Sequence, residues 1–316
     1  MVAIRDRPIL TDVYQGLGEF VPQPGSAYIY GTSAEKRSAH SSTWEQQAAD
    51  VGFFPVLQQE DETVEIEVMG SPRLLALRSG RQLSDFWLKT DVRAAYLDIT
   101  GLAHHIWAPL LRSALSTIDV VRVVYVEPQD YTYSSFPTEG EIFDLSEKIK
   151  GIAPIPGFAS LRESREADIC FVPLLGFEGP RLAYLLESVQ PPRDRIVPIV
   201  GVPGFRPEYP FHTYQGNRLP LIQNLSWKNV RFAIANCPFS LFYTLQDIAA
   251  SYAGNLMKIA PIGTKPHALG AVLYAMTATQ PVELVYDHPI RKATRTTGSA
   301  RALIYHVSAL GFSGRG

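Results

Sequence analysis

Cysteine is scarce in this sequence, which has only Cys170 and Cys237 among its 316 residues. Both lie in apolar surroundings, ADICFVPLL and FAIANCPFS, where a cysteine usually serves as a small buried hydrophobic residue. We therefore expect free thiols rather than a disulfide or a catalytic pair. The sequence also lacks CxxC and HExxH motifs, so a zinc site would need ligands from scattered positions, and we expect no structural metal.

Long hydrophobic runs are missing as well. No stretch reaches the roughly 18 uncharged apolar residues that a membrane-spanning helix needs. The first residues, MVAIRDRPILTDVYQ, mix acidic and basic side chains and contain no apolar run typical of a signal peptide. These absences predict a cytoplasmic protein with no membrane segment. With 46% hydrophobic and 19% charged residues, the chain can bury a large core and is expected to be globular.

The net charge of -2 hides an asymmetry along the chain. Residues 1–200 carry 18 basic and 27 acidic side chains, whereas residues 201–316 carry 11 basic and 4 acidic ones. The first part therefore has a charge of -9 and the second a charge of +7. A cationic final third on an anionic body predicts a localised site for an anion.

Short apolar, β-branched runs alternate with helix-like stretches, a pattern typical of parallel βα units. In the first half we expect strands at residues 26–30, 51–57, 94–99 and 120–126, with helices at 33–50 and 102–116. The segment from about 60 to 93 interrupts this order. Its alternating stretch TVEIEVMG predicts a half-exposed strand of a small antiparallel insertion.

A second βα series follows GIAPIPG at 151–157, which is the best candidate for a linker. Here we expect strands at 168–175, 195–201, 230–235, 256–260 and 282–286, with helices at 179–189, 240–253 and 266–278. Residues 202–220 contain too much proline and aromatic sequence for a regular element. We expect them to form either an ordered functional loop over a strand end or an ordinary surface crossover.

Two consecutive series predict an α/β protein with two Rossmann-like parallel-sheet halves, because the chain is long enough for two domains. The first domain is expected at residues 1–150, with the β insertion at about 60–93. The second is expected at residues 158–316 and ends in a basic tail.

The first candidate site follows strand SAYIY, in the stretch GTSAEKRS. Gly31 would let backbone N–H groups face a ligand, and the hydroxyls of Thr32 and Ser33 would add to the dipole of the following helix, which favours an anion. Glu35 and Arg37 would complete the site. Alternatively, Ser33 is a helix N-cap that needs no ligand, and the charged residues only solvate the first helical turn.

The second candidate site is LDITGL, at the carboxyl end of another expected strand. Ligands of open α/β sheets gather outside such ends, so Asp98 and Thr100 are placed to meet a ribose or a metal-bound phosphate. The alternative is that Asp98 caps the following helix. His104 and His105 come next, and at most one of them can face the same ligand, since adjacent helical residues diverge by about 100°.

The third candidate site, GFEGPR, follows strand DICFVPLL. Its glycine turn places Glu178 and Arg181 at a helix entrance, and Pro180 suits the first helical turn. Arg181 would either bind a phosphate with its fork of donors or hold Glu178 in place.

The fourth candidate site is PIGTKPHALG, between an expected strand and a helix. Gly263 allows close backbone approach, Thr264 supplies a hydroxyl and Lys265 a compact cation, while the helix N-terminus presents free N–H groups. His267 in the first turn is a further ligand-binding candidate. The stretch is not a Walker A loop, which needs GxxxxGK[ST], so ATP hydrolysis of that type is not expected. The alternative is a plain turn.

The tail IRKATRTTGSAR is strongly basic through Arg291, Lys292, Arg295 and Arg301. It forms either a solvated face or a clamp for a phosphate backbone or an acidic partner. Few aromatic residues are interleaved with these charges, so a compact anion is favoured over extended single-stranded nucleic acid.

The segment MKIAPIGTKPHALGAVLYAMTATQPVELVYDHP resembles the closing βα unit of CARF domains, the Rossmann-like nucleotide sensors of prokaryotic antiviral systems. Two such halves in one chain also resemble SAVED domains. The stretches GTSAEKRS and DITG resemble segments of proteins encoded in bacterial defence loci. The resemblance implies that Thr264 and Lys265 lie near a cyclic oligonucleotide. No appended nuclease, protease, TIR or membrane effector is recognisable, so it also implies a separate effector.

We therefore expect a sensor or adaptor of a bacterial antiphage defence system that binds a nucleotide-derived anion, with no other cofactor. Thr32, Ser33 and Arg37 would serve one half, and the other half would use Arg181, Thr264 and Lys265. One alternative is a nucleotide-processing hydrolase acting on a phosphodiester or glycosidic bond, whose general acid or base would be Glu35, Asp98 or Glu178. Another is a structural subunit whose basic tail docks DNA or an acidic protein. Homo-oligomerisation stays open.

Overall fold

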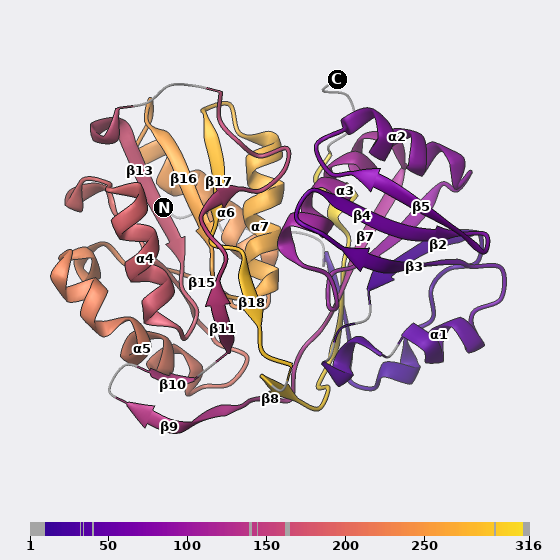
Figure 1. The fold of residues 1–316 in the computed structure, drawn as a ribbon, viewed down its shortest axis with the longest axis horizontal. Coiled ribbons are helices and arrows are strands. Elements are labelled where there is room, and N and C mark those ends of the chain that lie inside the picture. Colours follow the sequence, from indigo (N-terminus) through magenta and orange to yellow (C-terminus); the bar gives the residue numbers. More distant parts are fainter. Residues whose placement is uncertain are drawn as a thin grey trace. The chain divides into compact units, whose positions relative to one another are not determined.

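The computed structural model describes residues 10–31, 33, 35–39, 41–138, 141–143, 145–161, 165–293 and 295–311. The chain forms two compact units: unit 1 comprises Met1–Asp130 and Thr296–Gly316, and unit 2 comprises Tyr131–Arg295. Each unit is built on a mixed sheet with a parallel centre (Figure 1). This confirms the predicted α/β class with two Rossmann-like halves.

Unit 1 contains an eight-stranded sheet in the order β1-β20-β7-β6-β2-β3-β4-β5. The four central strands, from β7 to β3, are parallel, and the strands outside them are antiparallel. The bounds of the strands are β1 (Thr11–Tyr14), β2 (Ser26–Gly31), β3 (Gly52–Gln59), β4 (Thr63–Val68), β5 (Ser71–Ala76), β6 (Ala94–Asp98), β7 (Val120–Val126) and β20 (Ala302–Tyr305). Strands β4 and β5 are the predicted antiparallel insertion.

The first helix of unit 1, which follows the GTSAEKRS motif, begins later in the chain than the sequence indicated. The predicted helix at 33–50 is shorter, with a 3-10 turn at Lys36–Ser38 followed by α1, because the chain first makes a buried turn around Arg37 and Ser38. The bounds are η1 (Leu17–Glu19), η2 (Lys36–Ser38), α1 (Ser41–Gln47), α2 (Gly80–Lys89), α3 (His104–Thr117) and η6 (Val307–Leu310). All positions of β2 and almost all of α3 are buried, which is typical of the centre of an α/β core.

Unit 2 contains a six-stranded sheet in the order β12-β17-β16-β13-β14-β15. All neighbours are parallel except β12, which runs antiparallel to β17. The bounds are β12 (Ala153–Pro154), β13 (Ile169–Leu174), β14 (Ile199–Gly201), β15 (Arg231–Ala233), β16 (Leu256–Pro261) and β17 (Val282–Tyr286). Its helices are α4 (Gly179–Val189), α5 (Tyr209–Gln223), α6 (Pro238–Ser251) and α7 (Lys265–Thr277), with 3-10 turns η3 (Glu166–Asp168), η4 (Arg193–Arg195) and η5 (Ser226–Asn229).

Helices α4 and α5 lie on one face of this sheet and α6 and α7 on the other (Figure 1). Leu182, Leu185 and Leu186 of α4 pack with Phe171 of β13 and Val200 of β14 in one buried cluster. Burial of several leucine side chains of this kind stabilises a unit by about 1.5–3 kcal/mol each. The helices are therefore anchored so that their N-termini point to the carboxyl edge of the sheet.

Short strands complete unit 2 and mark its ends. β9 (Tyr133–Thr138) pairs with β10 (Glu141–Phe143), and β11 (Ser146–Ile149) pairs with β18 (Pro289–Arg291). The chain passes from one unit to the other within β8 (Asp130–Tyr131) and just before β19 (Thr296–Thr297).

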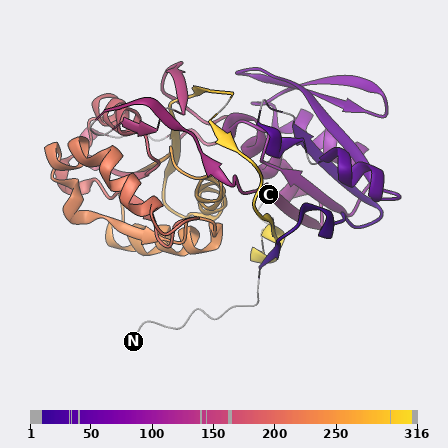
Figure 2. The same ribbon diagram turned by 90° about the horizontal axis from the view of Figure 1, so that it is seen from below.

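The unit boundaries differ from the predicted 1–150 and 158–316. Strand β20 from the C-terminal segment pairs with β7, so the chain returns to complete the sheet of unit 1 (Figure 1 and Figure 2). Residues 131–150 instead belong to unit 2, where β11 pairs with β18. GIAPIPG does not separate the units, because β12 within it is hydrogen-bonded to β17.

Residues 202–220 were also predicted incorrectly as lacking a regular element, because most of them form α5. Pro210 lies in the first turn of α5, where backbone N–H groups make no hydrogen bond within the helix, so the lack of an N–H group in proline costs nothing there. Pro220 lies in the last turn. Both cysteines are free as expected, and burial raises the pKa of Cys170 to about 12. Within the part of the chain that the structure describes, no helix has the length and apolar character needed to cross a bilayer.

Candidate functional site

A pocket in unit 2 lies where the parallel strands end. Its lining includes Gly176, Gly201, Ala235 and Gly263, which are at or just beyond the carboxyl ends of β13, β14, β15 and β16. It encloses about 620 Å³, including the space open to solvent at its mouth.

The centre of the pocket is the point where the order of the strands changes direction. From β13 the chain crosses to β14 on one side, whereas β16, on the other side, is reached later through α6. Connections that leave adjacent strands in opposite directions open a crevice at the carboxyl edge, the usual ligand site of such sheets. This topology, rather than any single residue, positions the pocket.

Gly176 and Gly263 bring the two loops of this crevice into direct backbone contact. A Cβ atom on Gly176 would lie 2.7 Å from the carbonyl oxygen of Ile262, and one on Gly263 would lie 2.6 Å from that of Leu175. Both distances are far below an ordinary contact, so only glycine fits at either position. The predicted close backbone approach at Gly263 is thus explained by packing against the loop after β13.

Arg181, a predicted anion ligand, is buried and holds Asp287 in a bidentate ion pair. Nε donates to Oδ2 at 2.6 Å and Nη2 to Oδ1 at 2.7 Å, while Nη1 donates to the carbonyl oxygen of Ile262 at 3.0 Å. Burial opposes the charge on Asp287, but the hydrogen bonds and charge of Arg181 prevail and lower its pKa. Arg181 lines the pocket with most of its donors already engaged.

Glu178, the candidate general acid or base of unit 2, is also engaged. Its carboxylate accepts hydrogen bonds from the backbone N–H of Leu145 at 3.2 Å and the hydroxyl of Ser146 at 3.0 Å, and lies 3.5 Å from Nη1 of Arg181. The side chain therefore ties the β11 segment to the start of α4. Its geometry is that of a structural carboxylate at the edge of the pocket.

Two arginines of the basic tail line the pocket, although they were predicted as docking residues. Arg291 donates to the hydroxyl of Tyr286 at 3.3 Å, and Arg295 is almost completely buried. Lys292, which lies between them in sequence, does not line the pocket. Arg301 belongs to unit 1, where it pairs with Glu127 at 2.8 Å.

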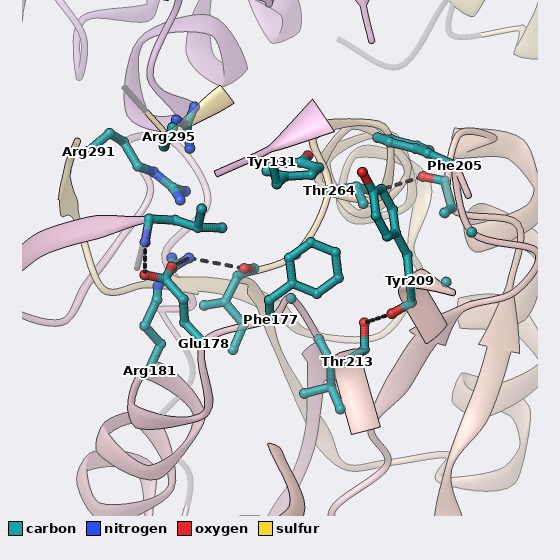
Figure 3. Close-up of a pocket in the computed structure, with 18 residues that line it drawn as sticks. Tyr131, Phe177, Glu178, Arg181, Phe205, Tyr209, Thr213, Thr264, Arg291 and Arg295 are labelled. Atoms are coloured by element: carbon teal, nitrogen blue, oxygen red, sulfur yellow. Dashed lines mark hydrogen bonds and ion pairs between the residues drawn. The ribbon is translucent and has the colours of Figure 1, made fainter. Parts of the chain in front are cut away.

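Aromatic rings line the pocket beyond these arginines. Figure 3 shows Arg291 and Arg295 on one side, Phe205 and Tyr209 on the other, and Phe177 and Tyr131 between them. Sequence reasoning missed this aromatic wall, which we define as Tyr131, Phe177, Phe205 and Tyr209. The available signal was the concentration of aromatic residues in 202–220 and the phenylalanine in GFEGPR.

The GTK stretch contributes to the pocket in part. Thr264 lines it and caps α7, since its hydroxyl accepts from the N–H of His267 at 3.2 Å and donates to the carbonyl of Ala235 at 2.8 Å. Lys265 is half-buried and does not line the pocket, and neither does His267. Burial lowers the pKa of His267 to about 4, so the ring is neutral at physiological pH.

In unit 1, the residues of GTSAEKRS bond mainly to one another and to the nearby backbone. Arg37 is buried, pairs with Glu35 at 2.8 Å and donates to the carbonyl of Val126 at 2.6 Å, while Thr296 donates to Glu35 at 2.6 Å. The backbone N–H of Ser33 donates to Ser38 at 2.9 Å. Thr32 lies outside the described residues. Gly31 packs directly against Gly101, which requires a residue without a side chain at position 101.

The DITG stretch is likewise satisfied internally. Asp98 accepts hydrogen bonds from the hydroxyl of Tyr28 and the N–H of Thr100, both at 2.8 Å. The hydroxyl of Thr100 accepts from the N–H of Val126 at 3.0 Å. Burial, followed by the charge of Asp98, raises the pKa of Tyr28. Asp98 therefore stabilises the turn directly after β6 and does not cap the following helix, because the N-cap of α3 is Ala103.

The residues that the pocket brings together can bind an anion next to a planar apolar group. Among the described residues, no group of three or more His, Cys, Asp or Glu side chains is placed to hold a metal ion. Comparisons of the chain with protein-family models, with curated proteins and with solved structures found no match.

Proposed function

We propose that this protein is a sensor or adaptor of a bacterial antiphage defence system, acting in the cytoplasm with a separate effector. It binds a nucleotide-derived anion in the pocket of unit 2. The observation that carries this proposal is the presence of Arg291 and Arg295 in a pocket at the switch point between β13 and β16. A guanidinium group can donate two parallel hydrogen bonds to a phosphate, which suits this role.

The surrounding backbone also favours an anion. Helices α4 and α7 begin directly after the loops that contain Gly176 and Gly263, so their N-termini add partial positive charge at the same edge. Thr264 lies in the pocket, in keeping with the resemblance to CARF domains, whereas Lys265 departs from it. We assign to Arg291 and Arg295, which follow β17, the phosphate-binding role that was expected of Lys265.

The position of the pocket within the chain supports a sensor rather than a passive binder. Tyr131 and Arg295, which both line it, are the first and last residues of unit 2. The N–H of Thr132 donates to the carbonyl of Arg295 at 3.0 Å, so the two connecting segments are hydrogen-bonded to each other. A ligand that contacts Tyr131 and Arg295 therefore contacts both connections to unit 1.

Isothermal titration calorimetry with a panel of cyclic oligonucleotides and linear nucleotides tests this function. We expect at least one compound to bind, and Arg291→Ala to weaken binding by about 10- to 100-fold, the usual effect of losing a charged hydrogen bond. Lys292→Ala is the matched control, because it removes one positive charge from the same segment without altering the pocket lining. Equal losses in both variants, or no binding by any anion, would contradict the proposal.

A further inference from the structure

The aromatic wall of the pocket has a feature that binding of a simple anion does not explain: its rings pack against one another in fixed positions. Phe177 contacts the ring of Tyr131 at 5.3 Å and 88° and that of Tyr209 at 5.3 Å and 74°. Tyr131 and Tyr209 contact each other at 5.7 Å and 68°. These edge-to-face arrangements are the preferred geometry of aromatic pairs, so the rings hold one another in place.

A second layer fixes the wall from behind. Phe143 is buried and stacks on Phe177 with ring centroids 4.4 Å apart and planes inclined by 22°. Phe177 therefore has one face packed against the protein interior while it lines the pocket. A wall that is rigid before binding loses little conformational entropy when a flat ligand is placed against it.

The charged side of the same pocket is separate from this wall. Arg291 and Arg295 lie at the opposite side from Phe205 and Tyr209 in the close-up (Figure 3). Asp287 neutralises the charge of Arg181, whereas Arg291 donates to the hydroxyl of Tyr286 and lines the side of the pocket opposite Phe205 and Tyr209. A simple inorganic anion would use this side and leave the aromatic wall without a partner.

We infer that the pocket takes a nucleotide in one orientation, with the base against the aromatic wall and the phosphate toward Arg291 and Arg295. This inference rests on the proposed function and specifies its ligand as one that joins a planar ring to an adjacent phosphate. Any base can stack on an aromatic side chain, so the aromatic wall favours ligands that contain a base but does not distinguish one base from another.

The test compares phosphate ligands that contain a base with phosphate ligands that lack one. Calorimetry measures the binding of the four nucleoside 5′-monophosphates, cyclic dinucleotides, ribose 5-phosphate and inorganic phosphate. We expect the tightest base-containing ligand to bind at least tenfold more tightly than ribose 5-phosphate. Phe205→Ala should weaken that ligand by roughly tenfold and leave ribose 5-phosphate unchanged. Arg291→Ala should weaken both.

Phe211→Ala is the matched control, because Phe211 is 74% exposed on α5 and does not line the pocket. Phe205 is chosen over Phe177 because Phe177 also packs on Phe143, and its removal would disturb the fold. If ribose 5-phosphate binds as tightly as the nucleotides, or Phe205→Ala has no effect on them, the inference is wrong while the anion site stands. If no anion binds, including phosphate, the proposed function itself fails.

Discussion

Arg181 and Asp287 form a bidentate ion pair in the interior of unit 2, with distances of 2.6 and 2.7 Å between their donor and acceptor atoms. Arg181 lies in the first turn of α4, and Asp287 directly follows β17. The pair therefore connects two elements that border the pocket on either side of β13 and β16. Its first role is to fix the carboxyl edge of the sheet.

Replacing Arg181 by methionine leaves the buried carboxylate of Asp287 without its partner. We expect Arg181→Met to lower the free energy of unfolding by about 3–5 kcal/mol, the usual effect of removing one member of a buried pair. Urea denaturation followed by circular dichroism measures this change. The control is Arg193→Met, since Arg193 is exposed and its loss should change stability by less than about 0.5 kcal/mol. Similar small effects in both variants would contradict a structural role for the pair.

The contact between Gly176 and Gly263 predicts a second effect. A methyl group at either position would collide with a backbone carbonyl, so Gly176→Ala and Gly263→Ala should each destabilise the protein by about 1–3 kcal/mol. Both variants should also weaken nucleotide binding, because the loops must separate. Thermal unfolding and calorimetry measure the two effects.

Gly80→Ala provides the matched control for these variants. Position 80 begins α2, and a Cβ atom there would meet nothing within 4 Å. The substitution should therefore be neutral or stabilise the protein by up to about 1 kcal/mol. If Gly176→Ala and Gly263→Ala behave like Gly80→Ala, the loops are not in the contact described here.

The sequence predicted the regular elements around the pocket well. The strands β13 and β16 and the helices α4 and α7 lie within one residue of their expected bounds at each end, because apolar runs and glycine turns act locally. Strands β14 (Ile199–Gly201) and β15 (Arg231–Ala233) are shorter than the expected 195–201 and 230–235, and α5 was not expected at all. Its two prolines suggested an irregular segment, although a proline in the first helical turn is compatible with a helix.

The candidate site was predictable only in part, because it depends on contacts between distant residues. Position at a strand end suggested Gly263, Thr264 and Arg181 as ligand-binding residues, and all three line the pocket. Nothing local showed that Asp287, 106 residues after Arg181, would occupy its guanidinium group. In the same way, the return of β20 to unit 1 follows from pairing with β7 and has no signal of its own in the C-terminal segment.

His267 predicts how stability depends on pH. Its pKa is about 4 in the folded protein and about 6.5 when unfolded, because burial disfavours the charged ring. The unfolded state therefore binds more protons between these values, and stability present above pH 6.5 is lost as the pH falls toward 4. The shift corresponds to roughly 3 kcal/mol.

Urea midpoints of the wild type and His267→Gln, measured from pH 7 to pH 4, test this prediction. Glutamine has a donor that can replace the contact between Nε2 and the carbonyl of Ile234, which is 3.1 Å long. The variant should therefore lose less stability than the wild type over this range. Parallel pH profiles for the two proteins would show that His267 does not titrate as described.

Hydrogen exchange tests whether ligand binding reaches the connections between the units. The ligand is the nucleotide that binds most tightly in calorimetry, added at saturation. If it contacts Tyr131 and Arg295, exchange should slow at residues 131–133 and 295–297, since the N–H of Thr132 is bonded to the carbonyl of Arg295. Strands β4 and β5 serve as an internal control, because they lie in unit 1 and contribute nothing to the pocket. Arg295→Ala should remove the protection at both connections. Protection limited to residues 175–178 and 262–264 would instead describe a pocket that binds its ligand without passing the signal to unit 1.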